Sequence, residues 1–122
     1  MILSVEPMES LRYLPFLRID GWLITNKKTY VNINDYPDES ALYTEIGKIK
    51  NHRIIDAAEI ASILGSQKVS NIVMLGAASG LLGLPDGSLD KALWTIFGRK
   101  GEEIVNLNIS ALKAGAEAAN IS

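Results

Sequence analysis

The 122-residue sequence contains no cysteine and a single histidine, His52. Without cysteine, this chain forms no disulfide, no thiolate metal site and no iron–sulfur ligation of its own. A single histidine makes a histidine-based metal site improbable. The formal net charge is only -2, acidic and basic residues are interspersed, and no long basic run occurs. We therefore expect no nucleic-acid partner, because nucleic-acid binding requires a basic patch or stripe.

The sequence also lacks a transmembrane span and a secretory signal. Its longest apolar stretch, Asn71–Leu84, is shorter than the about 20 residues that cross a bilayer, has no basic flank and includes Asn71 itself. Met1–Val5 is apolar but short, has no basic residue before it and continues directly into Glu6-Pro7. We therefore expect no membrane partner and a cytoplasmic location.

The stretch Asn71–Leu84 is the centre of the predicted fold. Its only polar members are Asn71 and Ser79, and a helix that is apolar all round is a buried helix. Gly76, Gly80 and Gly83 recur in it at helical spacing, and each costs roughly 1 kcal/mol relative to alanine in a helix interior. Such a cost is tolerated where another backbone comes close. We predict a central buried helix that is pressed against a sheet or a neighbouring subunit.

Short apolar strands alternate with helical patterns in the first half of the chain, and helices follow one another in the second half. The predicted strands are Ile2–Val5, Trp22–Thr25, Thr29–Ile33 and Arg53–Asp56. The predicted helices run from Pro7 to Pro15, Glu39 to Lys50, Ala57 to Leu64, Val69 to Leu84, Ser88 to Phe97, and from Glu102 onward. This order predicts an α/β fold of the three-layer α/β/α type, with a small parallel or mixed sheet and a helical C-terminal layer.

Further details of the helices follow from residue type and spacing. Gly65 is predicted as a left-handed cap, and Ser88 as the cap of the next helix. The inner face of that helix is predicted to hold Leu89, Ala92, Leu93, Ile96 and Phe97, and the apolar stripe of the last helix to hold Ile104, Leu107, Ala111 and Gly115.

Three or four short strands leave open sheet edges, which usually pair with another strand. The first predicted strand begins at Ile2. We therefore expect a partner chain or a missing N-terminal half. When the chain is isolated, we expect a symmetric homodimer that pairs through the first strand, or through whichever strand the missing half would have covered.

No catalytic motif is present. No glycine-rich phosphate loop follows a strand, because the glycines at 76, 80 and 83 lie within a predicted helix. Glu6 and Asp56 end strands, where α/β folds present ligand groups. Asn71 opens the buried helix, and His52 lies in a polar turn. For each there is a more ordinary interpretation: Glu6 as a cap or surface acid, Asp56 as a helix cap, Asn71 as a structural hydrogen-bonding group, and His52 as a solvated loop residue.

Taken together, several segments resemble the gamma subunit or domain of the 2-oxoacid:ferredoxin oxidoreductases, which use pyruvate, 2-ketoisovalerate or indolepyruvate. In the second half they are Asn71-Ile-Val-Met-Leu-Gly-Ala77, Gly80-Leu-Leu-Gly-Leu-Pro85, Ser88-Leu-Asp-Lys-Ala-Leu93, Glu103-Ile-Val-Asn-Leu-Asn-Ile109 and Ala111-Leu-Lys-Ala-Gly115. In the first half they are Val5-Glu6-Pro7-Met-Glu-Ser-Leu-Arg12, Gly21-Trp-Leu-Ile-Thr-Asn26 and Ile54-Ile-Asp-Ala-Ala-Glu59. The resemblance covers nearly the whole chain and is strongest to the stand-alone form, the beta subunit of indolepyruvate oxidoreductase.

One departure from the family pattern affects the interpretation. The family begins with a strand, a Gly-x-Gly-Gly-Gln-Gly loop and a Ser-Gln-Arg-Gly-Gly segment, and neither motif occurs in this sequence. Residues 1–122 therefore resemble the C-terminal two-thirds of the gamma-type domain, truncated at the N-terminus.

The resemblance implies a supporting subunit that is not active alone. In this family, thiamine diphosphate and iron–sulfur clusters are bound by other subunits or domains, so no cofactor is expected on this chain. The family reaction is the oxidative decarboxylation of a 2-oxoacid to an acyl-coenzyme A, with ferredoxin as the electron acceptor. The chain would assist assembly and the coenzyme A side of the site, with Glu6 and Asn71 nearest to a shared surface.

An alternative from a different functional class remains open at this point. A non-enzymatic binding or assembly module would keep the packing pattern of the domain and lose the glycine loop. A neighbouring gene for a thiamine-binding, cysteine-rich subunit would favour the enzyme component over this alternative.

Overall fold

The computed structural model describes residues 1–4, 17, 21–27, 39–85 and 87–120. The chain divides into two compact units, Met1–Asp56 and Ala57–Ser122. The first unit holds a sheet and one described helix, and the second is helical.

Among the described residues, the sheet of the first unit has three parallel strands in the order β1-β2-β3. They are β1 (Ile2–Ser4), β2 (Trp22–Asn26) and β3 (Asn51–Ile55). Ile2 pairs with Leu23, and Trp22 pairs with Asn51. Leu23 and Ile24 of the central strand are fully buried, as expected for a parallel strand that is covered on both faces. The α/β class and the parallel sheet predicted from the sequence are therefore confirmed.

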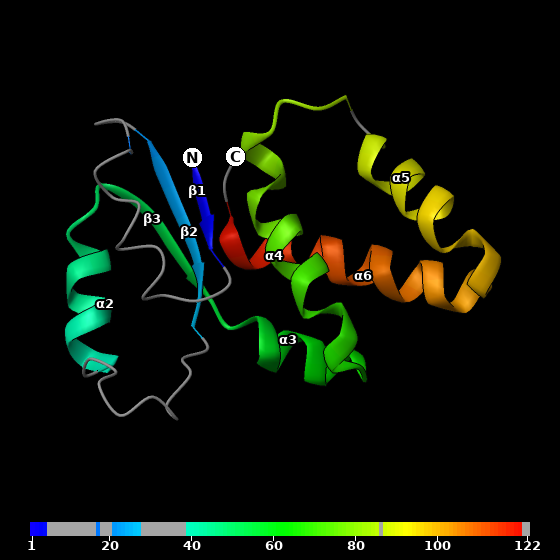
Figure 1. The fold of residues 1–122 in the computed structure, drawn as a ribbon, viewed down its shortest axis with the longest axis horizontal. Coiled ribbons are helices and arrows are strands. Elements are labelled where there is room, and N and C mark those ends of the chain that lie inside the picture. Colours follow the sequence, from blue (N-terminus) through cyan, green and yellow to red (C-terminus); the bar gives the residue numbers. More distant parts are fainter. Residues whose placement is uncertain (5–16, 18–20, 28–38, 86, 121–122) are drawn as a thin grey trace. The chain divides into compact units, whose positions relative to one another are not determined.

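Helix α2 (Glu39–Gly47) lies in the connection between β2 and β3, beside the sheet (Figure 1). Parallel neighbours require such a crossover connection. Ile46 of α2 is fully buried, and the Tyr43 hydroxyl donates a hydrogen bond to the carbonyl of Lys27, just after β2. The first unit therefore has a helix anchored to the end of its central strand.

The second unit contains four α-helices and three short 3-10 turns among its described residues. They are α3 (Ala57–Leu64), η2 (Gln67–Val69), α4 (Ser70–Ala78), η3 (Ser79–Leu81), α5 (Ser88–Phe97), η4 (Gly98–Lys100) and α6 (Glu102–Ala119). Helix α6 contacts all three other α-helices, and α3 and α5 lie on opposite sides of it (Figure 1). Helix α6 is thus the common support of this unit.

Helices α4 and α6 pack with their backbones in direct contact. A Cβ atom added at Gly76 would lie 2.0 Å from the carbonyl oxygen of Leu112, and one added at Gly115 would lie 1.9 Å from the carbonyl oxygen of Val73. Only glycine leaves room for this approach. The sequence correctly predicted that a second backbone comes close to this helix, and the structure identifies α6 as that backbone.

The predicted central helix Asn71–Leu84 is too long. Helix α4 ends at Ala78, the 3-10 turn follows, and Gly83 has a φ of +65°, which a right-handed helix does not permit. Leu82 and Leu84 are 37% and 49% exposed. The run of apolar residues in the sequence therefore extends beyond the end of the buried helix.

The buried stripe of α6 contains the predicted Ala111 and Gly115 but otherwise differs from the prediction. It consists of Val105, Asn108, Ala111, Leu112, Gly115 and Ala119. Ile104 is instead 37% exposed. The amide of Asn108 donates a hydrogen bond of 2.8 Å to the carbonyl oxygen of Ile104 within the same helix. A polar residue whose side-chain amide is hydrogen-bonded in this way can be part of the buried stripe. A search for apolar residues alone does not find such a residue.

The predicted inner face of α5 is only partly buried. Leu93 is buried, whereas Ala92 is exposed and Ile96 is 66% exposed. The reason is that α6 is the main neighbour of α5 among the described residues. The cap of α5 is Gly87, with a φ of +80°, and Ser88 is the first helical residue.

The other predicted helix and strand boundaries either agree with the structure or fall outside the residues that the structure describes. Helix α3 has the predicted bounds, and Gly65 after it has the predicted left-handed conformation, with a φ of +94°. Helix α6 begins at Glu102 as predicted. The predicted helix at 7–15 and the predicted strand at 29–33 both fall wholly outside the described residues. No described helix is long and apolar enough to cross a bilayer.

The contact between α4 and α6 yields a stability test. Gly76→Ala is expected to lower the free energy of unfolding by about 3 kcal/mol, the upper end of the cost of overpacking, because the added methyl group meets rigid backbone. Gly98→Ala is the matched control, since its Cβ would meet only the Trp94 ring, at 4.0 Å. Urea unfolding of both variants checks this, and equal midpoints would contradict the close contact.

Candidate functional site

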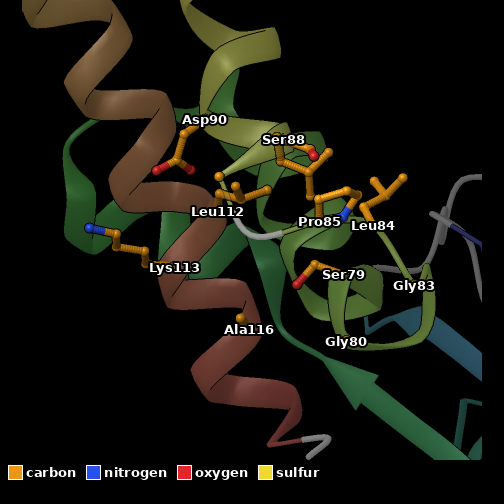
Figure 2. Close-up of a pocket in the computed structure, with 12 residues that line it drawn as sticks. Ser79, Gly80, Gly83, Leu84, Pro85, Ser88, Asp90, Leu112, Lys113 and Ala116 are labelled. Carbon is orange, nitrogen blue, oxygen red and sulfur yellow. The ribbon is translucent and has the colours of Figure 1, made fainter.

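The second unit contains an open pocket of about 430 Å³. It lies between the end of α4, the loop before α5, the start of α5 and one face of α6 (Figure 2). Its walls combine glycine and apolar residues with two hydroxyls and two charged groups, namely Ser79, Gly80, Gly83, Leu84, Pro85, Gly87, Ser88, Leu89, Asp90, Leu112, Lys113 and Ala116. A concave surface that combines apolar and polar groups is a candidate site for a ligand or a partner side chain.

Two features of the chain form the pocket. The contact of Gly76 with Leu112 brings the end of α4 against α6, so residues near 79 and near 113 share one wall. The left-handed Gly83 and Gly87 then turn the loop away from α4 before α5 begins. The hydroxyl of Ser79 donates a hydrogen bond of 2.6 Å to the carbonyl oxygen of Gly76, which closes the end of α4.

The charged groups of the pocket lie on one side of it. Figure 2 shows Asp90 and Lys113 on that side, and Leu84 and Pro85 on the opposite side. Lys113 is exposed and Asp90 is half-buried. A bound group would therefore meet opposite charges at one side and an apolar surface at the other.

A second polar cluster lies in the first unit, at the carboxyl ends of the strands. Ser4, Thr25 and Asn26 end β1 and β2 and are all buried, and the half-buried Asp56 follows β3 directly. Ser4 pairs with Thr25, and Asn26 pairs with Ile55, so the three strand ends are level with one another. Open α/β sheets bind ligands outside the carboxyl ends of their strands. We call Ser4, Thr25, Asn26 and Asp56 the carboxyl-edge cluster.

The predicted site residues fall in different parts of the chain. Glu6 lies outside the described residues. Asn71 is exposed in the first turn of α4, at the end opposite to the pocket, because Ser79 is eight residues, or about 12 Å, further along the helix axis. Asp56 ends β3 as predicted and joins the carboxyl-edge cluster.

His52 was wrongly placed in a solvated turn. It lies within β3, is half-buried, and its Nδ1 is 2.6 Å from the carbonyl oxygen of Ile49. The strand begins two residues earlier than predicted because Asn51 and His52 pair with Trp22 and Leu23.

Sequence patterns did not identify the residues of the pocket. Lys113 and Ser79 carry no motif, and they meet only because two glycines let α4 and α6 approach. The one usable signal was the Pro85-Asp-Gly87 turn before α5, which marks a loop at a helix start. Within the described parts of the chain, no three His, Asp or Glu side chains are close enough to hold a metal ion.

Comparisons with known proteins identify the family. The family model described as pyruvate ferredoxin/flavodoxin oxidoreductase matches residues 1–118. The chain belongs to this family. It is 30% identical over 122 residues to indolepyruvate oxidoreductase subunit IorB of Archaeoglobus fulgidus. This alignment covers 94% of this chain and 60% of the relative. The chain therefore spans about three-fifths of the length of that relative.

Two further matches come from longer proteins of the same kind. Ketoisovalerate oxidoreductase subunit VorA of Methanothermobacter thermautotrophicus is 42% identical over 65 residues, covering 52% of this chain and 13% of the relative. The solved 2-oxoglutarate:ferredoxin oxidoreductase of Magnetococcus marinus has a TM-score of 0.67 and 21% identity, covering 98% of this chain and 20% of that chain. The second match confirms the fold of this oxidoreductase domain.

The loop that carries the pocket wall yields a prediction. Gly83→Ala is expected to lower the free energy of unfolding by about 1 kcal/mol, because alanine is strained at a φ of +65°. Gly83→Asn should lower the free energy of unfolding by less than Gly83→Ala does, since asparagine adopts the left-handed conformation more readily than alanine. Thermal unfolding of both variants checks the order, and an alanine variant as stable as the wild type would contradict the loop conformation.

Proposed function

We propose that this chain is a supporting component of a 2-oxoacid:ferredoxin oxidoreductase, corresponding to the C-terminal part of its gamma-type domain and inactive alone. One observation carries the proposal. The same fold occurs both in a separate subunit, of which this chain spans 60%, and within a single chain, of which it spans 20%. A domain that is found both separate and fused is one that works in contact with the remainder of the enzyme.

We assign the thiamine diphosphate and iron–sulfur chemistry to the partner subunit. The sequence has no cysteine to ligate a cluster, so the residues of this chain do not fit an iron–sulfur group. What the described residues offer instead is a polar sheet edge and an open pocket. The chain is thus suited to supporting a neighbouring site rather than to holding the reacting atoms.

The proposal extends to coenzyme A and to a 2-oxoacid of the indolepyruvate type. The carboxyl-edge cluster supports a role beside a polar substrate, because it places hydroxyl, amide and carboxylate groups where α/β sheets bind ligands. Asn71 is exposed and therefore open to a partner surface. Glu6 comes two positions after Ser4 in the sequence, and we propose that it also faces the partner.

The test is reconstitution with the thiamine-binding subunit of the same enzyme. We expect the combined proteins to reduce a viologen dye when a 2-oxoacid and coenzyme A are both present, with indolepyruvate preferred to pyruvate. This chain alone should give no reduction. A complex that forms and changes no rate would instead favour the assembly module, and activity of this chain alone would contradict the proposal.

A second prediction concerns the open edge of the sheet. Among the described residues, β1 is paired on one side only, with β2, and Leu3 within it is 41% exposed. We expect the isolated chain to form a homodimer through this edge, because unpaired strand edges associate. Light scattering at micromolar concentration should give twice the chain mass, and Leu3→Pro should reduce it to one chain mass. A monomeric wild-type chain would contradict this pairing.

A further inference from the structure

The pocket of the second unit presents two charges of opposite sign that do not neutralise each other. Asp90 in the first turn of α5 and Lys113 on α6 both line it, on the same side (Figure 2). Both residues lie in the described part of the chain, and no salt bridge joins them. A bound group of opposite sign can therefore meet each of these charges.

A third polar group of the wall accepts hydrogen bonds but has no proton left to donate to a ligand. The Ser79 hydroxyl donates its proton to the carbonyl oxygen of Gly76, at 2.6 Å, and a hydroxyl has one proton and two lone pairs. The remaining lone pair capacity of Ser79 suits a ligand that carries N–H donors. The wall thus offers acceptors in Asp90 and Ser79 and a cationic donor in Lys113.

The side of the pocket opposite to the two charges is apolar. Leu84 and Pro85 lie there, and Leu112 of α6 adds a further aliphatic side chain to the wall (Figure 2). Leu84 is 49% exposed and Pro85 is also exposed, so this apolar surface meets water in the free chain. An apolar group of a ligand would remove it from water, which is favourable.

The size and the charges of the pocket together limit the class of ligand. The volume of about 430 Å³ is towards the lower end of the roughly 300–1,000 Å³ of small-molecule sites. A free α-amino acid is small, and it carries an ammonium group, a carboxylate and a side chain on one carbon atom. A residue within a peptide chain carries neither of these two charges, and a 2-oxoacid carries only the carboxylate.

We propose that this pocket binds a free α-amino acid with an apolar side chain. Asp90 and Ser79 accept hydrogen bonds from its ammonium group, Lys113 pairs with its carboxylate, and its side chain lies against Leu84 and Pro85. The inference does not depend on the proposed function, because this chain alone supplies every contact. It adds a site for a small molecule that is neither the substrate nor a cofactor of the proposed reaction.

The experiment is a titration of the full, isotope-labelled chain with L-phenylalanine, followed through the NMR shifts of its backbone amides. We expect saturable shifts at Gly80, Gly83 and Gly87, with a Kd of about 1 mM or below. Hydrocinnamate lacks the ammonium group and phenethylamine lacks the carboxylate. Each should bind about tenfold more weakly than L-phenylalanine, because a charged hydrogen bond is lost.

Two substitutions test the same contacts from the side of the protein. Asp90→Asn and Lys113→Met should each weaken the binding of L-phenylalanine about tenfold. Glu102→Gln is the matched control for the first, since Glu102 is an exposed acid in the first turn of α6 and does not line the pocket. Lys68→Met is the control for the second, since Lys68 is exposed and also outside the lining. Both controls should bind within about twofold of the wild type.

Several outcomes would overturn the inference. They are the absence of shifts at the three glycines up to about 10 mM L-phenylalanine, equal binding of either analogue, and equal weakening in the control variants. If coenzyme A shifts these glycines and L-phenylalanine does not, the pocket belongs to the proposed reaction and the amino-acid site is overturned. Thermal unfolding of the four variants separates lost binding from lost folding, and the analogues test the wild-type chain if a variant unfolds.

Discussion

The contact between the backbones of α4 and α6 is the constraint on which the second unit depends. Gly76 and Gly115 remove two side chains at the point where the helices cross, and the carbonyls of Leu112 and Val73 occupy the space. Close approach of this kind increases dispersion contact along both helices without adding any polar group to the interior. The buried residues Val73, Met74, Ala77 and Ala111 lie around this crossing in the two helices.

Several features with functional interest follow from that crossing. It brings the end of α4 to the face of α6 that carries Lys113, and so it creates the pocket. It also places α4 and α5 on α6 as separate neighbours, so α5 has one main packing partner and its Trp94 and Ile96 side chains stay exposed. The first unit contributes a different feature, the level carboxyl ends of three parallel strands with buried polar residues. The proposed supporting role uses these surfaces and assigns the cofactor chemistry to the partner subunit.

The sequence predicted what local chemistry determines and missed what tertiary contacts determine. The bounds of α3 and the start of α6 followed from a glycine after one helix and two glutamates at the start of the other. The close approach at Gly76 was also predictable, because glycine in an apolar helix has a cost that packing must offset. Three of the four predicted strands, recognised as short apolar runs between helices, correspond to β1, β2 and β3, and the sequence left open whether the sheet is parallel or mixed.

The errors have equally specific causes. Composition alone gave no sign that Gly83 takes a left-handed conformation and ends the apolar segment as a loop. Asn108 was left out of the stripe of α6 because its hydrogen bond to the Ile104 carbonyl is invisible in the sequence. The half-exposed inner face of α5 was not predictable, because an apolar stripe does not reveal how many neighbours cover it. The pocket was missed for the same reason, since its walls come from segments up to 37 positions apart, from Ser79 to Ala116.

The close crossing of α4 and α6 at Gly76 and Gly115 is the feature on which the second unit depends. Hydrogen–deuterium exchange, measured residue by residue on the wild-type chain and on the Gly76→Ala variant, tests this crossing directly. We predict slow exchange in α4 and α6 of the wild type, and exchange in both helices that is about tenfold faster in the variant, because the added methyl group forces the two backbones apart. Exchange in α4 and α6 that is unchanged by the substitution would contradict the close crossing.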